Sequence, residues 1–327
     1  MWMKSKNIQL TFGNLIMSKR TPEILVVGDI ILDHYLYGIT NRISPEAPVP
    51  IVECNEERWV LGGAANVANN LVAIRAKVTL AGIVGEDDNG ALVKNIVKSK
   101  GINDLICTSK NRKTTTKTRV ISNNHQLLRI DKEDKYPILN IEETELFNKI
   151  SLNIGNFDCI IISDYSKGLL TDTLIRKIIE ISNQNNFKVL VDPKTPPYIK
   201  YSGAYLIKPN KKEVMLETGV NIVDENTFSI AAHQIQTTTS CEVVVITLSE
   251  DGVGIYNKNI NKVLPTKAKE IFDVTGAGDT FIATLSFAIA KGKSIIESCE
   301  IANYASGVVI GKHGCVTVDY KEIESIL

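Results

Sequence analysis

Short, continuous apolar runs recur along the chain, and amphipathic segments separate them. Runs of this length without polar alternation are typical of strands that are buried on both faces of a sheet. Residues 170–182 and 229–238 carry apolar positions at helical spacing between such runs. This alternation predicts an α/β fold with a doubly wound, mostly parallel sheet. The apolar runs are residues 24–27, 78–81, 159–162, 189–191, 205–207 and 243–246.

Two segments depart from this alternation and predict a small β lid, at about residues 40–60 and 111–130. The first segment contains three prolines, and the second reads as a hairpin of β-forming residues around a turn. In a strand, the period of two places Lys113, Lys117 and Arg119 on one face. That face could meet an anionic substrate, although taken alone it is better explained as an ordinary solvated strand face.

The composition limits the number of domains and the kinds of partner. With 327 residues and 44% hydrophobic content, we expect one main core, formed by residues 21–327. Residues 1–20 are expected to be an N-terminal extension, disordered or frayed over residues 1–16, with Met17 as a candidate second start. The 37 basic and 37 acidic side chains give no net charge, which argues against nucleic acid and anionic lipid as partners.

The chain lacks the marks of membrane insertion and secretion. There is no apolar stretch of about 18 residues, so we expect no membrane span. The first 20 residues lack the long apolar core of a secretory signal. Six scattered cysteines show no zinc-binding spacing and mostly sit in apolar runs. Buried free thiols in a reducing compartment explain them, which predicts a cytoplasmic protein without a zinc site.

A glycine-rich turn, DVTGAGDT at residues 273–280, comes directly before an apolar run at residues 281–290. A turn of this kind that opens a helix directs unpaired backbone N–H groups and the positive end of the helix dipole toward one point, which suits a phosphoryl group. Asp279 lies at this point and would repel the phosphate unless it takes a proton from an attacking hydroxyl. The pattern indicates phosphoryl transfer to an alcohol, with a capped helix after a tight turn as the alternative.

Polar residues follow several of the apolar runs. Asp29 and Asp33 come after the first run, Asp164 and Lys167 after the third, and Lys194 after the fourth. In doubly wound sheets, ligands bind outside the carboxyl ends of the strands. Each polar loop alone is unremarkable, since loops are usually polar, but their repeated position predicts a binding site at this edge of the sheet.

Two motifs resemble the signatures of a known family. The segment GGAANVA at residues 62–68 resembles the N-terminal signature of the ribokinase-like (PfkB) carbohydrate kinases, and residues 273–279 resemble their C-terminal signature. Five further segments resemble the D-glycero-β-D-manno-heptose 7-phosphate kinases, and the similarity runs from about Glu23 to the C-terminus. Arg75 and Thr284 depart from the signatures outside the proposed chemistry. The five segments are residues 28–33, 42–50, 163–168, 191–194 and 307–312.

The resemblance implies a carbohydrate kinase that uses ATP and Mg²⁺. It implies that Asp279 is the general base and that the N–H groups of Thr275, Gly276, Ala277 and Gly278 hold the charge that develops on the phosphoryl group.

An Asn-x-x-Glu element at residues 210–213 is the candidate metal site. The resemblance implies that Asn210 and Glu213 organise Mg²⁺ through its waters. Read without the family, residues 211–213 are a helix-start charge cluster.

The resemblance also assigns a sugar site. Asp33 and Asn66 match the hydroxyl-binding residues of the family, and Gly62 and Gly63 would let the backbone approach the sugar ring. Asp29 and Asp164 are expected to assist, with a turn or a helix cap as the alternative for each.

A substrate phosphate would need cations apart from the anion-binding turn, and Arg119, Lys167 and Lys194 are the candidates. For the nucleotide, the candidates are Thr247, Ser249, Gly252, Thr275, Asn303, Val308 and Gly314. Asp273 and Gly314 also match positions near a monovalent-cation site, such as a K⁺ site, in some relatives.

The implied reaction is phosphorylation of the anomeric hydroxyl of D-glycero-D-manno-heptose 7-phosphate to the 1,7-bisphosphate, a step toward ADP-heptose for the lipopolysaccharide core. The chain ends just after the kinase part, so we expect another protein to carry the following nucleotidyl transfer. Relatives pair through their lids, which implies a homodimer. The alternatives are another sugar kinase of this family, acting on ribose, fructose or a sugar phosphate, and a non-catalytic sugar- or nucleotide-binding protein.

Overall fold

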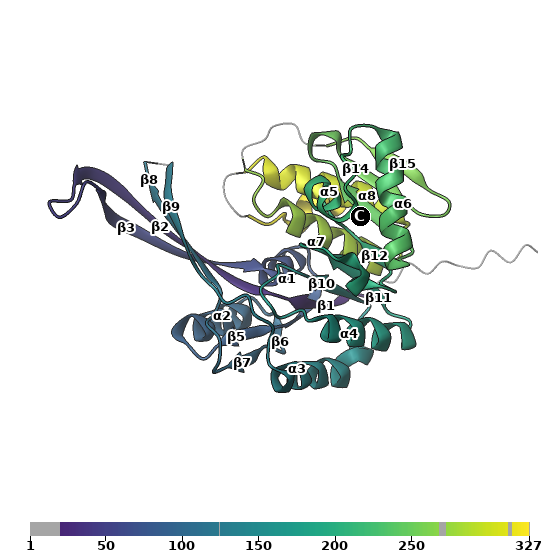
Figure 1. Cartoon of the computed structure of the whole chain (residues 1–327), viewed down its shortest axis with the longest axis horizontal. Coiled ribbons are helices and arrows are strands. Elements are labelled where there is room, and N and C mark those ends of the chain that lie inside the picture. The colour runs from purple at the N-terminus through teal and green to yellow at the C-terminus, as the bar shows by residue number, and fades with distance from the viewer. Residues whose placement is uncertain (1–19, 124, 268–272, 313–315, 327) are drawn as a thin grey trace, which may run out of the picture.

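The computed structural model describes residues 20–123, 125–267, 273–312 and 316–326 (Figure 1). The expected N-terminal extension therefore lies outside the described residues, except for Arg20, and so does Gly314. Among the described residues, no helix is both long and apolar enough to cross a membrane.

A nine-stranded sheet forms the centre of the molecule. Neighbouring strands are parallel except at one edge, where β14 runs antiparallel to both β13 and β15. The six predicted apolar runs all lie in or at these strands, so the predicted α/β class with a mostly parallel sheet is confirmed. In spatial order the strands are β15 (Asn261–Leu264), β14 (Val253–Tyr256), β13 (Val243–Thr247), β12 (Leu206–Ile207), β11 (Lys188–Asp192), β10 (Cys159–Ser163), β1 (Glu23–Gly28), β4 (Lys77–Ala81) and β6 (Asn103–Asp104).

Helices cover both faces of this sheet, which explains why the strands are apolar on both sides. In β1, Ile24 and Val26 join one hydrophobic cluster, and Leu25 and Val27 join the other. The first cluster packs against α1 (Ala64–Ala73), α2 (Asp88–Ser99), α7 (Ala277–Ala290), α8 (Ile295–Ile310) and α9 (Tyr320–Ile323). The second packs against α3 (Asn140–Asn153), α4 (Asp172–Gln184), α5 (Lys211–Thr218) and α6 (Glu225–Thr239).

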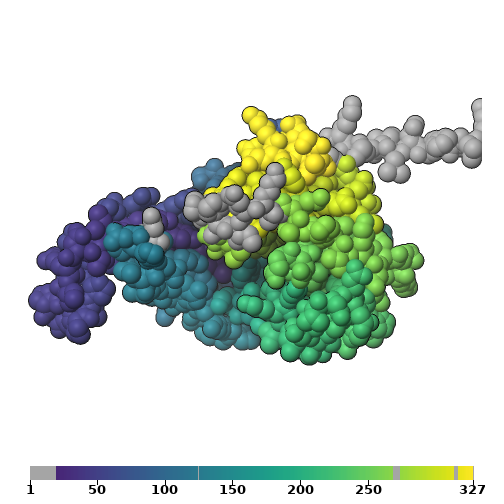
Figure 2. All heavy atoms as spheres, turned by 90° about the horizontal axis from the view of Figure 1, so that it is seen from above, coloured from purple at the N-terminus to yellow at the C-terminus, as the bar shows by residue number. Residues whose placement is uncertain are grey.

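A second sheet projects from the body as a curved ribbon, which we call the lid (Figures 1 and 2). Its order is β3 (Pro50–Gly63), β2 (Ile30–Ile43), β8 (Thr116–Ser122) and β9 (His125–Lys132), and β2 and β8 are parallel. A short pair, β5 (Ile83–Gly85) with β7 (Cys107–Ser109), lies near its base.

The lid strands are longer than the sequence indicated. β2 begins at Ile30 and β3 ends at Gly63, so the ribbon extends well beyond residues 40–60. Only Asp29 separates β1 from β2, so the chain passes from the central sheet into the lid without an intervening loop. Lys113 lies before β8, whose first residue is Thr116, so its predicted strand position is wrong.

Candidate active site

A cleft of about 700 Å³ lies at the carboxyl ends of β10, β11, β12 and β13 and extends to the start of α7. This is the edge at which a doubly wound sheet binds its ligands. The cleft brings together twelve of the predicted site residues, namely Asp164, Lys194, Asn210, Glu213, Thr247, Ser249, Gly252, Gly276, Ala277, Gly278, Asp279 and Asn303.

Asp279 lies in the first turn of α7, and its carboxylate is buried. The Tyr165 hydroxyl donates to Oδ1 at 2.5 Å, and the Asn66 amide donates to Oδ2 at 2.6 Å. Burial raises the pKa of Asp279, and these two hydrogen bonds and the ammonium of Lys208 only partly oppose that effect. The carboxylate is therefore a stronger base than an exposed aspartate and is held in a fixed orientation.

The start of α7 has the geometry of an anion-binding turn. Gly276 is its N-cap residue and has a φ of 81°, which favours glycine. The N-terminus of the helix directs backbone N–H groups and its positive dipole toward the cleft. A Cβ atom at Gly278 would lie 3.7 Å from Lys208 Nζ, so a buried ammonium group lies beside this turn.

Lys208 is paired rather than isolated. Its Nζ lies 2.9 Å from Asp192 Oδ1. Burial lowers the pKa of Lys208, but the carboxylates of Asp192, Glu213 and Asp279 raise it more, so that the net shift is upward. Burial in turn raises the pKa of Asp192 to about 7, against the effect of Lys208. The cation therefore stays charged next to the turn and adds to its attraction for a phosphoryl group.

Asp29 organises the loop that presents Tyr165. Its carboxylate accepts backbone N–H bonds from Tyr165 at 2.9 Å, Lys167 at 3.1 Å and Leu169 at 3.3 Å. Burial, followed by the nearby charge of Asp164, raises the pKa of Asp29 to about 6. These contacts correspond to the turn-forming alternative for this residue.

Asp164 is also engaged within the protein. It accepts hydrogen bonds from Lys200 Nζ at 2.9 Å and the Tyr201 hydroxyl at 2.6 Å, and from the Ser166 N–H. It still lines the cleft.

The predicted sugar-binding residues lie at the junction of the lid and α1. Asp33 in β2 forms an ion pair with Arg119 in β8 at 2.5 Å. A Cβ atom at Gly62 would lie within contact distance of Asp33 Oδ2, so a larger residue at this position would displace the Asp33 carboxylate. Gly63, with a φ of 57°, turns the chain into α1, which carries Asn66. Asp33 is also close enough to influence the charge of Asp279.

Asn210 and Glu213 form the capping box of α5. Asn210 Oδ1 accepts from the Glu213 N–H at 3.0 Å, and Glu213 Oε2 accepts from the Asn210 N–H at 2.9 Å. Glu213 Oε1 accepts from Lys194 Nζ at 3.1 Å. This arrangement matches the helix-start alternative, and because both carboxylate oxygens have partners, a bound Mg²⁺ would fit best through water. Among the described residues, no group of three or more His, Cys, Asp or Glu side chains could hold a metal ion directly.

The structure does not bring the three predicted phosphate-binding cations together. Arg119 pairs with Asp33, and Lys194 lies in the cleft with Glu213. Lys167 contacts Glu133 at the base of the lid. The sequence could not separate these positions because each partner is distant along the chain.

Two nucleotide-site expectations also differ from the structure. Val308 packs against the hydrophobic core and does not line the cleft. The Thr275 N–H donates to Asp273 Oδ1 at 2.8 Å, at the edge of the anion-binding turn and outside the cleft lining. Asn303 lines the cleft and donates to the Pro265 carbonyl at 2.8 Å.

Tyr165, Lys208 and Asp192 are site residues that the sequence analysis did not select. Tyr165 and Asp192 lie inside the motif segments at residues 163–168 and 191–194, where a tyrosine or an aspartate alone gives no periodic signal. Lys208 directly follows the apolar run at residues 205–207, and this position at a strand end is the sequence signal that could identify it, whereas its burial appears only in the fold.

The geometry places a basic carboxylate beside an anion-binding turn, within a cleft large enough for a nucleotide. Such an arrangement can accept a proton from a hydroxyl while the turn holds the phosphoryl group that the hydroxyl attacks.

Two curated bacterial proteins share extensive sequence similarity with the chain. Bifunctional protein HldE of Sulfurimonas denitrificans is 48% identical over 310 residues, which cover 94% of this chain and 65% of that protein. Bifunctional protein HldE of Helicobacter hepaticus is 44% identical over 308 residues, covering 94% of this chain and 64% of that protein. The chain thus spans just under two thirds of the length of these relatives.

Solved structures share the fold at low sequence identity. Arabidopsis thaliana ribokinase complexed with ribose and ATP matches with a TM-score of 0.74 and 19% identity, over 94% of this chain and 99% of that chain. Escherichia coli phosphofructokinase-2 in complex with potassium matches with a TM-score of 0.77 and 15% identity, over 94% and 98% of the two chains. The family model described as pfkB family carbohydrate kinase matches residues 21–322, and the chain therefore belongs to the pfkB family of carbohydrate kinases.

Proposed function

We propose that this kinase uses ATP to phosphorylate the anomeric hydroxyl of D-glycero-D-manno-heptose 7-phosphate, giving the 1,7-bisphosphate for ADP-heptose and lipopolysaccharide core synthesis. The observation that carries the kinase chemistry is the buried Asp279 carboxylate beside the N-terminus of α7. The choice of heptose is supported by the motif segments that resemble heptose 7-phosphate kinases and by the 48% identity to an HldE protein over the same part of the chain.

In the proposed reaction, Asp279 takes the proton of the sugar hydroxyl as that oxygen attacks the γ-phosphorus of ATP. Tyr165 and Asn66 hold both carboxylate oxygens, so the base does not need to reorient. The N–H groups of Gly276 and Gly278 and the Lys208 ammonium stabilise the charge on the transferred group, while the leaving group is ADP; the Ala277 N–H donates to the Val274 carbonyl.

The nucleotide would occupy the 700 Å³ cleft, next to Thr247, Ser249 and Gly252. Asn210 and Glu213 would hold Mg²⁺ through water, because Glu213 already accepts hydrogen bonds at both oxygens. When bound, Mg²⁺ neutralises phosphate charge. A K⁺ site near Asp273 remains a prediction.

The oligomeric state and location are further parts of the proposal. The lid carries exposed apolar side chains, including Ile43 at 69% and Ile130 at 55% exposure. A second lid would cover them, so we propose a homodimer formed through the lids. We propose a cytoplasmic location, consistent with free buried thiols at Cys107 and Cys159.

The substrate assignment is tested by ADP release on a panel of heptose 7-phosphate, unphosphorylated heptose, ribose and fructose. We expect the highest kcat/KM for the heptose 7-phosphate, and phosphorus NMR should place the new phosphate on the anomeric oxygen. A higher kcat/KM for ribose or fructose would contradict the heptose assignment and leave the kinase chemistry standing.

Asp279→Asn removes the proton acceptor but keeps the size of the side chain. We expect kcat to fall about 10²- to 10⁴-fold, the usual contribution of a general base. Thermal melting and ATP binding, measured by calorimetry, should stay close to wild type. Turnover within a few fold of wild type would exclude Asp279 as the base.

Tyr165→Phe removes one hydrogen bond that opposes the rise in the pKa of Asp279. Asp279 must be deprotonated to act, so activity is lost as the pH falls through its pKa. With that pKa raised further, the acid limb of the kcat/KM profile should move upward by about one pH unit.

The matched control for this profile is Tyr256→Phe, whose hydroxyl contacts His233 in α6 at 3.2 Å and which should keep the wild-type profile. An acid limb that moves downward or stays in place in Tyr165→Phe contradicts the role of Tyr165.

Ile43→Glu places a charge on the exposed apolar surface of the lid. We expect light scattering to give the mass of a dimer for the wild type and of a monomer for this variant, since the charge would have to be buried in the lid interface. Ile141→Glu is the control, because Ile141 is 76% exposed on α3, outside the lid. A wild-type monomer at all working concentrations would rule out the dimer.

A further inference from the structure

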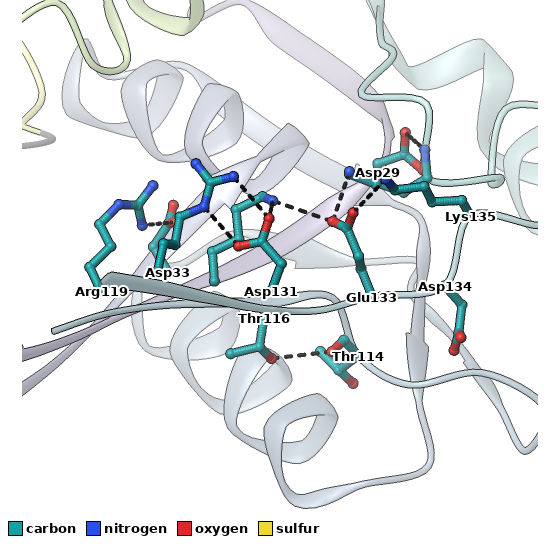
Figure 3. A network of polar contacts seen from close by, with 12 residues as sticks. Asp29, Asp33, Thr114, Thr116, Arg119, Asp131, Glu133, Asp134 and Lys135 are labelled. Atoms are coloured by element: carbon teal, nitrogen blue, oxygen red, sulfur yellow. Dashed lines mark hydrogen bonds and ion pairs between the residues drawn. The ribbon is translucent and has the colours of Figure 1, made fainter. Parts of the chain in front are cut away.

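Two ammonium groups converge on a single carboxylate oxygen at the base of the lid. Glu133 Oε2 lies 2.7 Å from Lys167 Nζ and 3.3 Å from Lys117 Nζ (Figure 3). The other oxygen, Oε1, lies 3.2 Å from Lys135 Nζ. The side chains of Lys117 and Lys167 are each 15% exposed, and that of Glu133 is 10% exposed. This is the coordination that a phosphate oxygen would have between two lysines.

This cluster lies directly beside the predicted sugar site. Lys117 in β8 is the register partner of Asp33 in β2, so the two side chains share one face of the lid sheet. Lys167 belongs to the loop that Asp29 ties down and that presents Tyr165 to Asp279. A sugar held between Asp33 and Asp279 would therefore have the lysine pair on its lid side.

The net positive charge of the cluster is about equal in size to the negative charge of a phosphate ester. Lys117, Lys135, Lys167 and Arg129 supply four positive charges, and the contacting carboxylates of Asp131 and Glu133 remove two of them. A phosphate ester carries nearly two negative charges at neutral pH. Burial opposes ionisation of Glu133, but its lysine partners lower the pKa of Glu133 to about 2, so this carboxylate is charged under all working conditions.

We infer that Lys117 and Lys167 bind the phosphate group of the sugar substrate, and that Glu133 occupies their site in the free protein until the phosphate displaces it. The inference rests on the proposed function in that it assigns a site to the substrate phosphate. It replaces two of the cations expected from the sequence, since Arg119 holds Asp33 and Lys194 lies on the nucleotide side of the cleft.

The inference predicts that substitution of either lysine and substitution of Glu133 change KM in opposite directions. Lys117→Ala and Lys167→Ala should each raise KM for heptose 7-phosphate about 10- to 100-fold, because each loses a charge-assisted hydrogen bond to the phosphate. Glu133→Gln should lower this KM about threefold to tenfold, because the phosphate no longer competes with an internal anion. For the unphosphorylated heptose, all three variants should keep the wild-type KM.

Two further variants separate this role from a structural one. Lys132→Ala, at the end of β9 next to Glu133 but paired with Asp87, should leave KM for both sugars unchanged. Lys117→Arg should restore most of the affinity for the phosphorylated sugar, since it keeps the charge. Equal losses on both sugars in the two lysine variants would overturn the inference. A raised KM for heptose 7-phosphate in Glu133→Gln would overturn the displacement of Glu133.

A binding measurement keeps the inference separate from the proposed function. With the nucleotide cleft filled by an unreactive ATP analogue, calorimetry with inorganic phosphate should detect binding to the wild type and at least tenfold weaker binding to Lys117→Ala and Lys167→Ala. Equal phosphate affinity in all three proteins, or none in the wild type, would overturn the inference. A wild type that binds phosphate here but does not turn over heptose 7-phosphate would overturn only the heptose assignment.

Discussion

The structure depends on holding the carboxylate of Asp279 in one fixed orientation inside a buried site. Burial alone would favour the neutral form of Asp279, and two hydrogen bonds and a nearby ammonium oppose it. The donors come from α1 and from the loop after β10, so three distant segments must meet within hydrogen-bond distance. Packing of α1 against α7 supports this meeting, because Asn70 binds both Asn66 and Thr280.

A second buried carboxylate, that of Asp29, holds the loop whose Tyr165 hydroxyl orients Asp279. Asp29 collects three backbone N–H groups of the loop at residues 165–169, and in doing so it determines where the Tyr165 hydroxyl points. It can lie there because the chain leaves β1 for the lid at this residue, and because Gly28 carries no Cβ, which would lie 2.1 Å from the Ser163 carbonyl oxygen. The lid and the loop at residues 165–169 therefore share one anchoring point, which couples the position of the proposed sugar site to the position of Asp279.

The structural features that depend on a local sequence pattern could be predicted. Strands buried on both faces are continuous apolar runs, so the parallel sheet could be identified, and a glycine-rich turn before an apolar helix identified the start of α7. The sequence could not predict pairing between distant charges. Lys167 and Lys194 both follow strands as basic loop residues, yet one meets Glu133 and the other meets Glu213. The start of the lid could not be predicted either, because Gly28 and Asp29 interrupt the apolar run but do not show that the next strand, from Ile30, joins a second sheet.

Internal carboxylates neutralise the buried lysines both in the cleft and at the base of the lid. Lys208, beside the turn at the start of α7, is paired with Asp192, and Lys117 and Lys167, beside the proposed sugar site, are paired with Glu133. Largely buried cations without partners would destabilise the folded state, so a kinase that handles several phosphates needs internal anions while those phosphates are absent. These carboxylates then lower the affinity of the lysines for any anion that does not match the geometry of the lysine–carboxylate pair. In the proposed mechanism, a phosphate ester exchanges places with Glu133 rather than meeting bare charge, so binding selects a ligand that can supply several acceptor oxygens at once.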